Sequence, residues 1–558
     1  MPNATLSEKS SWLPIAHRGW SISSVLIALL ISIPLLVVLS FLLQPSNENW
    51  QHLWDYLLTD YLRNTLLLSL GVGLGVLLIG ISTAWLTSMC DFPGRRWLSW
   101  ALLLPMAIPA YIIAYTYTGM LDFAGPVQST LRQVFAWQNQ DYWFPEIRSL
   151  GGAICMLTLV LYPYVYMLTR AAFLEQSTCA LEVSRTLGKS PWGSFYRVAL
   201  PLARPAIITG LVLAMMETLA DYGTVQYFGV NTFTTGIFRI WFGMGDSVTA
   251  AQLSALLLLF VFFLILIEKY SRGRARFHHT STRYKQIKRI QLKGWRAVLA
   301  CVICLLPFVL GFLLPALQLS IWTVITANTS FTTDFARLFS NSLLLAIIAA
   351  VIAVSLALVL AYSKRLVATP VVKTAAQTAA LGYALPGTIV AVGVIIPFAW
   401  FDNTIDQWLR DNFNFSSGLL LSGTLFALLF AYTVRFLSVS LQAVDAGLEK
   451  IKPGMDDSAR SLGLKPFGVL TKIHMPLMRG TLLTALLLVF VDVLKELPAT
   501  LILRPFNFNT LAVRAYEMAN DEKLALAGAP ALLIVVAGIV PVILLSSVIN
   551  RARAGQQP

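Results

Sequence analysis

The chain carries the polar stretch Glu182-Val-Ser-Arg-Thr-Leu-Gly188, and a variant of it returns as Asp457-Ser-Ala-Arg-Ser-Leu-Gly463, 275 positions later. Nine residues after each glycine comes a tetrapeptide that ends in proline, at Pro201 and at Pro476. Glycine favours a tight turn, and proline disfavours helix in the residue before it. We therefore expect each copy to form two short helices around a glycine turn, with the proline closing the segment.

Other matches between the two parts of the chain keep nearly the same offset. Asn64-Thr-Leu-Leu-Leu matches Asn341-Ser-Leu-Leu-Leu, and Pro109 matches Pro386, both 277 positions apart. Several matches in the same order at a nearly constant spacing indicate an internal duplication. The expected division is a first half at 1–268, a connecting segment at 269–295 and a second half at 296–558.

The composition is that of a membrane protein. Of the 558 residues, 57% are hydrophobic and only 12% are charged, and the mean hydropathy is +0.71. Soluble domains are about 25% charged. The apolar runs, each close to the roughly 20 residues that a bilayer requires, fall at 22–44, 64–89, 97–122, 151–172, 203–228, 250–268, 297–323, 341–363, 375–400, 418–441, 480–503 and 527–549. The sequence predicts an all-α membrane protein of about twelve transmembrane helices in two six-helix repeats.

The distribution of basic residues orients these spans. The net charge is +14, but lysine and arginine gather in short stretches between apolar runs, above all in 269–295. This is the positive-inside pattern of an inner-membrane protein and not that of a nucleic-acid-binding protein. Both termini and the basic linker are expected in the cytosol. Since each half has an even number of spans, the repeats are parallel and related by a pseudo-two-fold axis along the bilayer normal.

The repeated polar segments resemble the EAA signature of permeases of ATP-binding-cassette (ABC) importers, with expected loops at 174–201 and 449–476. The resemblance implies the type I permease fold and assigns contact with a separate ATPase to Glu182, Gly188, Pro201, Asp457, Gly463 and Pro476. Val183, Ser184, Ser458 and Met475 depart mildly from the signature, as does Asp457. Leu187-Gly-Lys-Ser190 looks like the end of a phosphate-binding loop, but its leading glycine and preceding strand are missing. The implied partners are thus two copies of a cytosolic ATPase subunit, and the chain itself is expected to be no enzyme and to need no cofactor.

The stretches after the two motifs resemble permeases of periplasmic ferric-iron importers, in which the two halves are commonly fused. They begin at Glu217-Thr-Leu-Ala-Asp221 and at Asp492-Val-Leu-Lys-Glu496. The resemblance implies import of ferric iron from the periplasm to the cytoplasm, together with a periplasmic ferric-ion-binding protein.

Four carboxylates in these stretches form our hypothesis for the ion path. Glu217 and Asp221 are four residues apart, which predicts one shared helix face, and Asp492 and Glu496 repeat the pattern. Carboxylates inside a membrane normally face a polar cavity or a charged partner, and hard cations prefer oxygen ligands. The alternative is that the acids pair with Lys495 or other basic groups and only hold or gate the helices. No firm metal site is predicted.

Other functions remain open at this stage. Thiamine or another small cation is a second substrate class for the same kind of importer. A two-half secondary transporter also has twelve spans, but it does not predict a polar glycine-centred segment in both halves. A membrane-embedded enzyme is disfavoured because the five histidines and the acids show no nucleophile–base set.

Overall fold

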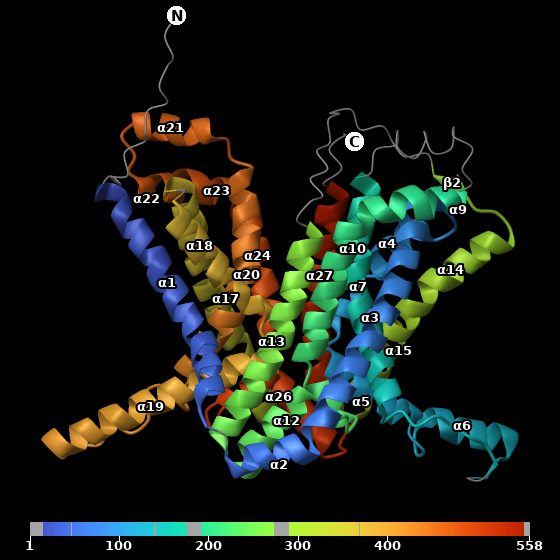
Figure 1. Cartoon of the computed structure of the whole chain (residues 1–558). Coiled ribbons are helices and arrows are strands. Elements are labelled where there is room, and N and C mark those ends of the chain that lie inside the picture. Colours follow the sequence, from blue (N-terminus) through green and yellow to red (C-terminus); the bar gives the residue numbers. More distant parts are fainter. Residues whose placement is uncertain are drawn as a thin grey trace, which may run out of the picture.

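The computed structural model describes residues 15–45, 47–138, 141–175, 191–272, 289–367 and 369–551, and these residues are almost entirely helical (Figure 1). The elements up to the linker are α1 (Ile15–Ser40), η1 (Phe41–Leu43), α2 (Glu48–Tyr56), α3 (Leu58–Met89), β1 (Cys90–Asp91), α4 (Arg95–Ala101), η2 (Leu104–Ala107), α5 (Ala110–Leu121), α6 (Pro126–Phe135), α7 (Leu150–Glu175), α9 (Pro191–Ser194), η3 (Phe195–Ala199), α10 (Leu200–Ala220), α11 (Gly223–Tyr227), α12 (Phe233–Phe238), η4 (Arg239–Met244) and α13 (Ser247–Arg272).

The elements after the linker repeat much of this order. They are β2 (Ile290–Gln291), α14 (Trp295–Phe308), η5 (Val309–Leu313), α15 (Leu314–Ile325), α16 (Ala327–Ser330), α17 (Thr333–Val367), α18 (Pro370–Ala379), η6 (Ala380–Ala384), α19 (Gly387–Phe413), α20 (Leu425–Glu449), α21 (Pro453–Ser461), α22 (Pro466–Val469), η7 (Leu470–His474), α23 (Met475–Leu477), α24 (Arg479–Leu494), α25 (Pro498–Leu503), α26 (Leu511–Asn520) and α27 (Gly528–Arg551).

The described residues contain nine helices long and apolar enough to cross a membrane, or up to eleven if two bent helix pairs each count as one span. The last predicted run is α27, whose apolar part Gly528–Ile543 is shorter than the others. The all-α membrane architecture is therefore confirmed. The count of nine to eleven among the described residues lies close to the expected number of about twelve, and some of the predicted runs are broken helices.

The third predicted span of each half is interrupted at the proline that the repeat analysis singled out. Ile108 and Leu385 are extended, with φ/ψ of −97°/119° and −84°/127°, and the next helix starts just after Pro109 and Pro386. A proline clashes with a helical conformation of the residue before it, which ends the helix at this point. In the first half the two parts differ in direction by 93°.

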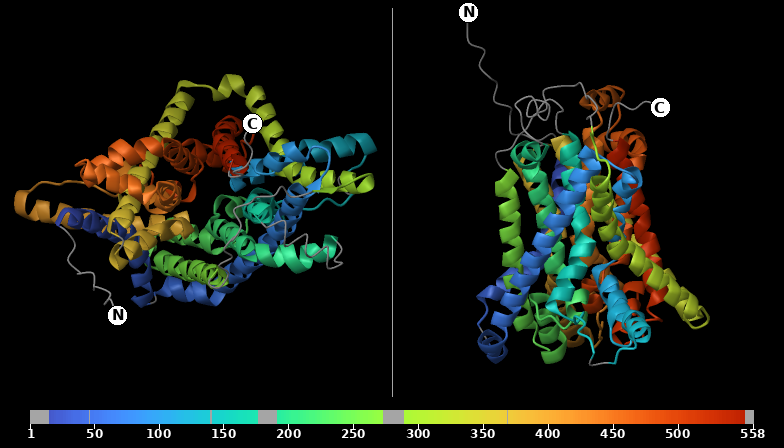
Figure 2. Two further views of the ribbon diagram at one scale, coloured as in Figure 1. Left: turned by 90° about the horizontal axis from the view of Figure 1, so that it is seen from above. Right: turned by 90° about the vertical axis from the view of Figure 1, so that its right-hand side faces the viewer.

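The first span of each half packs against the other half. α1 contacts α17, α18 and α19, whereas α14, η5 and α15 contact α3, α4, α5 and α7. Figure 1 shows α1 beside α18 on one side of the molecule and α14 beside α3 and α4 on the other, and Figure 2 shows α14 at the periphery from two further directions. The first span of each half therefore makes contacts across the division that we expected at the basic linker.

Glycines allow α3 and α7 to lie in close contact. A Cβ atom on Gly71 or Gly75 would lie 2.6 Å from Ile154 Cδ1 or Thr158 Cγ2 respectively, so α3 and α7 can only approach this closely at glycine. Packing of this kind is typical of membrane helices, in which van der Waals contact drives association. The Gly71-x-x-x-Gly75 pattern is therefore a packing motif.

One end of the molecule gathers the predicted cytosolic elements. α9, α21, α22 and β2 lie at the end where α1 begins and α27 finishes, and α2, α6, α12 and α26 lie at the opposite end (Figure 1). The first of these ends also carries basic residues. Arg95 lies shortly after α3, and the last turn of α17 contains Lys364 and Arg365. This arrangement agrees with the orientation expected from the charge pattern.

Candidate functional site

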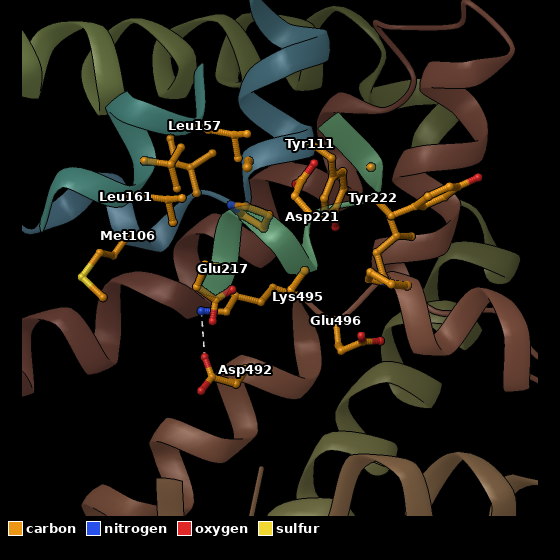
Figure 3. Close-up of a pocket in the computed structure, with 18 of the residues that line it drawn as sticks. Met106, Tyr111, Leu157, Leu161, Glu217, Asp221, Tyr222, Asp492, Lys495 and Glu496 are labelled. Carbon is orange, nitrogen blue, oxygen red and sulfur yellow. Dashed lines mark ion pairs between the residues drawn. The ribbon is translucent and has the colours of Figure 1, made fainter. Parts of the chain in front are cut away.

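A cavity of about 120 Å³ lies where helix breaks from the two halves meet. Its wall includes Ile108 and Pro109 from the break before α5, and Gly223 and Pro498 at the starts of α11 and α25. All four carboxylates singled out from the sequence also line it, and Figure 3 labels them together with Lys495; they are Glu217, Asp221, Asp492 and Glu496. A second basic side chain, that of Arg435, belongs to the same wall. The structure thus brings the predicted acids together around one space.

The shared helix face that we expected for each acid pair is wrong. α10 ends at Ala220 and Asp221 is already extended, with φ/ψ of −67°/130°, while α24 ends at Leu494, before Glu496. Each of these two carboxylates instead caps the short helix that follows. Asp221 accepts from the backbone N–H groups of Thr224 and Val225, both at 3.1 Å. A carboxylate at a helix N-terminus stabilises the unpaired N–H groups and interacts favourably with the positive end of the helix dipole. The pattern of apolar residues in the sequence did not reveal that new helices start at these points.

Glu496 repeats this capping in the second half and also forms an ion pair. It accepts from the N–H groups of Ala499 and Thr500, both at 3.1 Å, and its Oε1 lies 2.6 Å from Arg435 Nη1. The Glu496 side chain is 1% exposed and that of Arg435 is 11% exposed. A buried pair of this kind is strongly destabilised when one partner is removed, so it fixes the junction between α20 and α25.

Lys495 forms an ion pair with Asp492 and lines the cavity together with Glu217 of the first half. Its Nζ lies 2.7 Å from Asp492 Oδ1. Figure 3 shows the Lys495 side chain reaching toward Asp492, with Glu217 beside it. The pairing of acids with Lys495, which the sequence analysis left as the alternative, is therefore present. Within the described residues, no group of three or more His, Cys, Asp or Glu side chains is arranged to hold a metal ion.

Both basic groups come from the second half. At the spacing of 275 that relates the later parts of the repeats, Arg435 corresponds to Val160 and Lys495 to Ala220, and all four of these residues line the cavity. The sequence analysis missed Arg435. The available signal was a lone arginine inside the apolar run 418–441, because a charge at that depth is costly unless it is paired.

The second polar segment forms the expected pair of short helices. α21 ends at Ser461, Gly463 adopts a left-handed conformation with φ of 83°, and α22 starts at Pro466. The Gly463 N–H donates to the Arg460 carbonyl and the Leu464 N–H to that of Ala459, which satisfies the end of α21. Asp457 is exposed on α21. Pro476 lies in α23, just before the chain turns by 82° into α24.

The first copy can be compared only in part. Glu182 and Gly188 lie outside the described residues. Pro201 does not close its segment as expected, because η3 runs directly into α10 and Pro201 occupies the first turn of that helix. Proline cannot donate a hydrogen bond to the preceding turn, and here that turn is the π-helical η3, which departs from regular α-helix.

A charged network attaches the second segment to α17. Asp456 Oδ2 lies 2.7 Å from Arg365 Nε and its Oδ1 lies 2.7 Å from His474 Nε2, while the Arg365 guanidinium also donates to the carbonyls of Leu448 and Ile451. Tyr362 donates to the Pro466 carbonyl. Burial opposes ionisation of Asp456, but the hydrogen bonds from Arg365 and His474 outweigh it and lower its pKa.

The family described as the inner membrane component of binding-protein-dependent transport systems matches this chain twice, at residues 76–276 and 378–555. The chain belongs to this family. The permease therefore contains two copies of the family's domain in one polypeptide, which confirms the duplication and the type I ABC importer permease fold. Each match includes one EAA-like segment.

The permease is similar to several characterised transport proteins. It is 25% identical to the Fe(3+)-transport system permease protein FbpB 2 of Haemophilus influenzae over 531 residues, which covers 93% of this chain and 97% of that protein. It is 21% identical to the ferric transport system permease protein FbpB of Actinobacillus pleuropneumoniae, covering 75% and 61%. One part is 29% identical to the molybdenum transport system permease protein ModB of Escherichia coli, covering 39% of this chain and 99% of that protein.

Family membership decides the broad function. The permease is a multi-pass inner membrane protein that works in transport and performs no catalysis of its own. Its family implies an ATPase and a periplasmic binding protein as partners. The two-half secondary transporter, an alternative at the level of sequence, is thereby excluded.

Proposed function

We propose that this permease carries ferric iron from the periplasm to the cytoplasm. The observation that carries the proposal is its similarity to the Haemophilus influenzae Fe(3+) permease along nearly the whole of both chains, including both repeats. The molybdenum permease resembles only a stretch of one-repeat size. The partners are then a periplasmic ferric-ion-binding protein and two copies of a cytosolic ATPase subunit, one for each polar segment.

The chemistry of the cavity supports a cation as cargo. Four carboxylates and two basic groups give its wall an excess of negative charge, and oxygen ligands suit a hard trivalent ion. The absence of a tight cluster of metal ligands among the described residues suits a passage site. A transported ion has to be attracted strongly enough to enter and weakly enough to leave.

ATP-driven movement reaches this cavity through the polar segments. Leu462 and Phe467 of the second segment are 84% and 66% exposed, which is unusual for large apolar side chains that do not face lipid. We assign them to the contact with the ATPase. Movement of α21–α23 is transmitted to α24, which follows them directly in the chain. α24 carries Asp492 and ends at the cavity.

The test is uptake of radioactive iron into lipid vesicles that contain the permease, its ATPase and its binding protein. ATP-dependent, vanadate-sensitive uptake is expected for the wild type. Glu217→Gln should reduce uptake about 100-fold or more, because a unit charge near a trivalent ion contributes several kcal/mol at an effective dielectric of about 20. Glu48→Gln, which neutralises an exposed carboxylate at the start of α2, is the matched control and should transport normally.

Two results would contradict the proposal. Wild-type vesicles that hydrolyse ATP in response to the binding protein but accumulate no iron would exclude iron as cargo. Normal iron uptake by Glu217→Gln would exclude this carboxylate from the ion path.

A further inference from the structure

Lys495 occupies a special place with respect to the internal symmetry. Glu217 and Asp492 are equivalent positions of the two repeats and line the same cavity as Lys495. The Lys495 Nζ lies 2.7 Å from Asp492 Oδ1, and Figure 3 shows Glu217 beside the Lys495 side chain. Its own equivalent, Ala220, has no charge. The single Lys495 ammonium therefore provides positive charge near two symmetry-related carboxylates. A cation that passes between the halves would do the same.

The two basic groups of the cavity differ in how firmly they are held. Arg435 and Glu496 are 11% and 1% exposed, and Gly387 lies so close that a Cβ atom there would be 2.6 Å from Arg435 Nη1. The Lys495 side chain is 31% exposed and Asp492 is 18% exposed. Lysine is a compact charge on a flexible four-carbon stem. Arg435 is thus locked into the wall, whereas Lys495 has room to move.

We propose that Lys495 is a tethered counter-cation that occupies the space between Glu217 and Asp492 in the state without cargo and sets the charge an ion needs to pass. This inference rests on the proposed cation transport. Coulomb attraction scales with the product of the charges, so a monovalent ion gains nothing over the ammonium that it replaces, and a trivalent ion gains about threefold. Because the ammonium is tethered, its effective concentration at the acids is high, and a weakly bound ion cannot compete.

The proposal predicts that cations bind more tightly when Lys495 is neutralised, because an ion no longer has to displace the ammonium from the two acids. Tb³⁺ is a hard trivalent cation that prefers oxygen ligands, so it serves as the probe. The full transporter, with its ATPase subunits, is reconstituted in lipid nanodiscs and titrated with Tb³⁺, whose luminescence is sensitised by tyrosines such as Tyr111 and Tyr222 in the cavity wall. The cavity signal is the part that Glu217→Gln removes. Lys495→Ala should lower the Tb³⁺ concentration that gives half of this signal by about 10-fold or more.

Matched variants separate this role from a structural one. Lys495→Arg keeps the charge and should retain the wild-type half-saturating Tb³⁺ concentration. Arg410→Ala removes the basic member of another ion pair, with Asp406 at 2.7 Å on α19, and should leave that concentration unchanged. Lys495→Gln keeps length and a donor for Asp492, and it replaces Lys495→Ala if that variant does not insert.

The outcomes distinguish this inference from the proposed function. An unchanged half-saturating Tb³⁺ concentration in the Lys495→Ala or Lys495→Gln variant, or a Tb³⁺ signal that Glu217→Gln does not reduce, overturns the counter-cation. Failure of the wild type to import iron, with that concentration lowered as expected, overturns iron as cargo and supports the counter-cation.

Discussion

At the scale of single residues, the repeats differ in how closely side chains approach the backbone at the break in the third span. The first half has Ala110 after its proline, and the second has Gly387 at the matching position. A Cβ atom on Gly387 would lie 2.5 Å from Glu496 Oε1 and 2.6 Å from Arg435 Nη1. Glycine is thus required where the buried ion pair presses on the start of α19, and alanine suffices where the arginine is replaced by Val160.

Gly387→Ala should therefore destabilise the permease. Forcing a methyl group into a filled site typically costs about 1–3 kcal/mol, and here it also displaces a buried ion pair. Thermal unfolding of the purified protein measures the effect. Gly480→Ala is the control, because no atom outside its own helix lies within 4 Å of the added Cβ. Equal stability of the two variants would refute the steric argument.

At the scale of elements, the second polar segment depends on one ionised carboxylate. α21 and η7 are joined to the end of α17 through Asp456, Arg365 and His474. The segment is otherwise short helices with exposed faces, so these contacts determine whether it moves as one body with the transmembrane helices.

Acid should loosen this attachment. Because the pKa of Asp456 is lower in the folded protein than the ordinary value of about 3.9, ionised Asp456 contributes stability above that value. The contribution is lost as pH falls below about 4 and through the folded pKa. Hydrogen exchange of α21 should accelerate in this range relative to α20. Asp456→Asn should abolish the pH dependence, and Glu449→Gln, at the exposed end of α20, should retain it.

At the scale of the whole molecule, the two repeats hold each other by exchanging their first spans. α1 belongs in sequence to the first half but lies against α17–α19, and α14 lies against α3 and α4 (Figure 1). The parallel pairing of Cys90 with Ile290 and of Asp91 with Gln291 adds a backbone link between the end of α3 and the last part of the linker. Relative motion of the halves must therefore carry these exchanged helices along.

Cutting the chain in the linker should leave a transporter that reassembles. Fragments 1–280 and 281–558, expressed together, are expected to copurify through a tag on one of them and to keep ATP-dependent uptake. Each fragment alone should be degraded, since it exposes the polar cavity wall and lacks one exchanged helix. A single fragment that resists protease as well as the uncut chain would contradict the exchange.

Much of this protein could be predicted from sequence because the relevant signals are local or periodic. Apolar length determined the membrane class, since every stretch buried in lipid must satisfy its own backbone. The constant offsets between Gly188 and Gly463 and between Pro109 and Pro386 determined the duplication, and charge between spans determined the orientation. The turn at Gly463 followed from glycine's conformational freedom.

Only the tertiary structure decided which groups meet. The sequence placed Asp221 and Glu496 on continuous helices, whereas each caps a new short helix after a break, because N–H groups exposed in the membrane interior need an acceptor. It also gave no means to know that Arg435 pairs with Glu496, or that Lys495 and Asp492 line one cavity with Glu217 of the other half. These contacts join residues far apart in the chain, and long-range electrostatic pairing depends on distances that arise only when the two halves pack together.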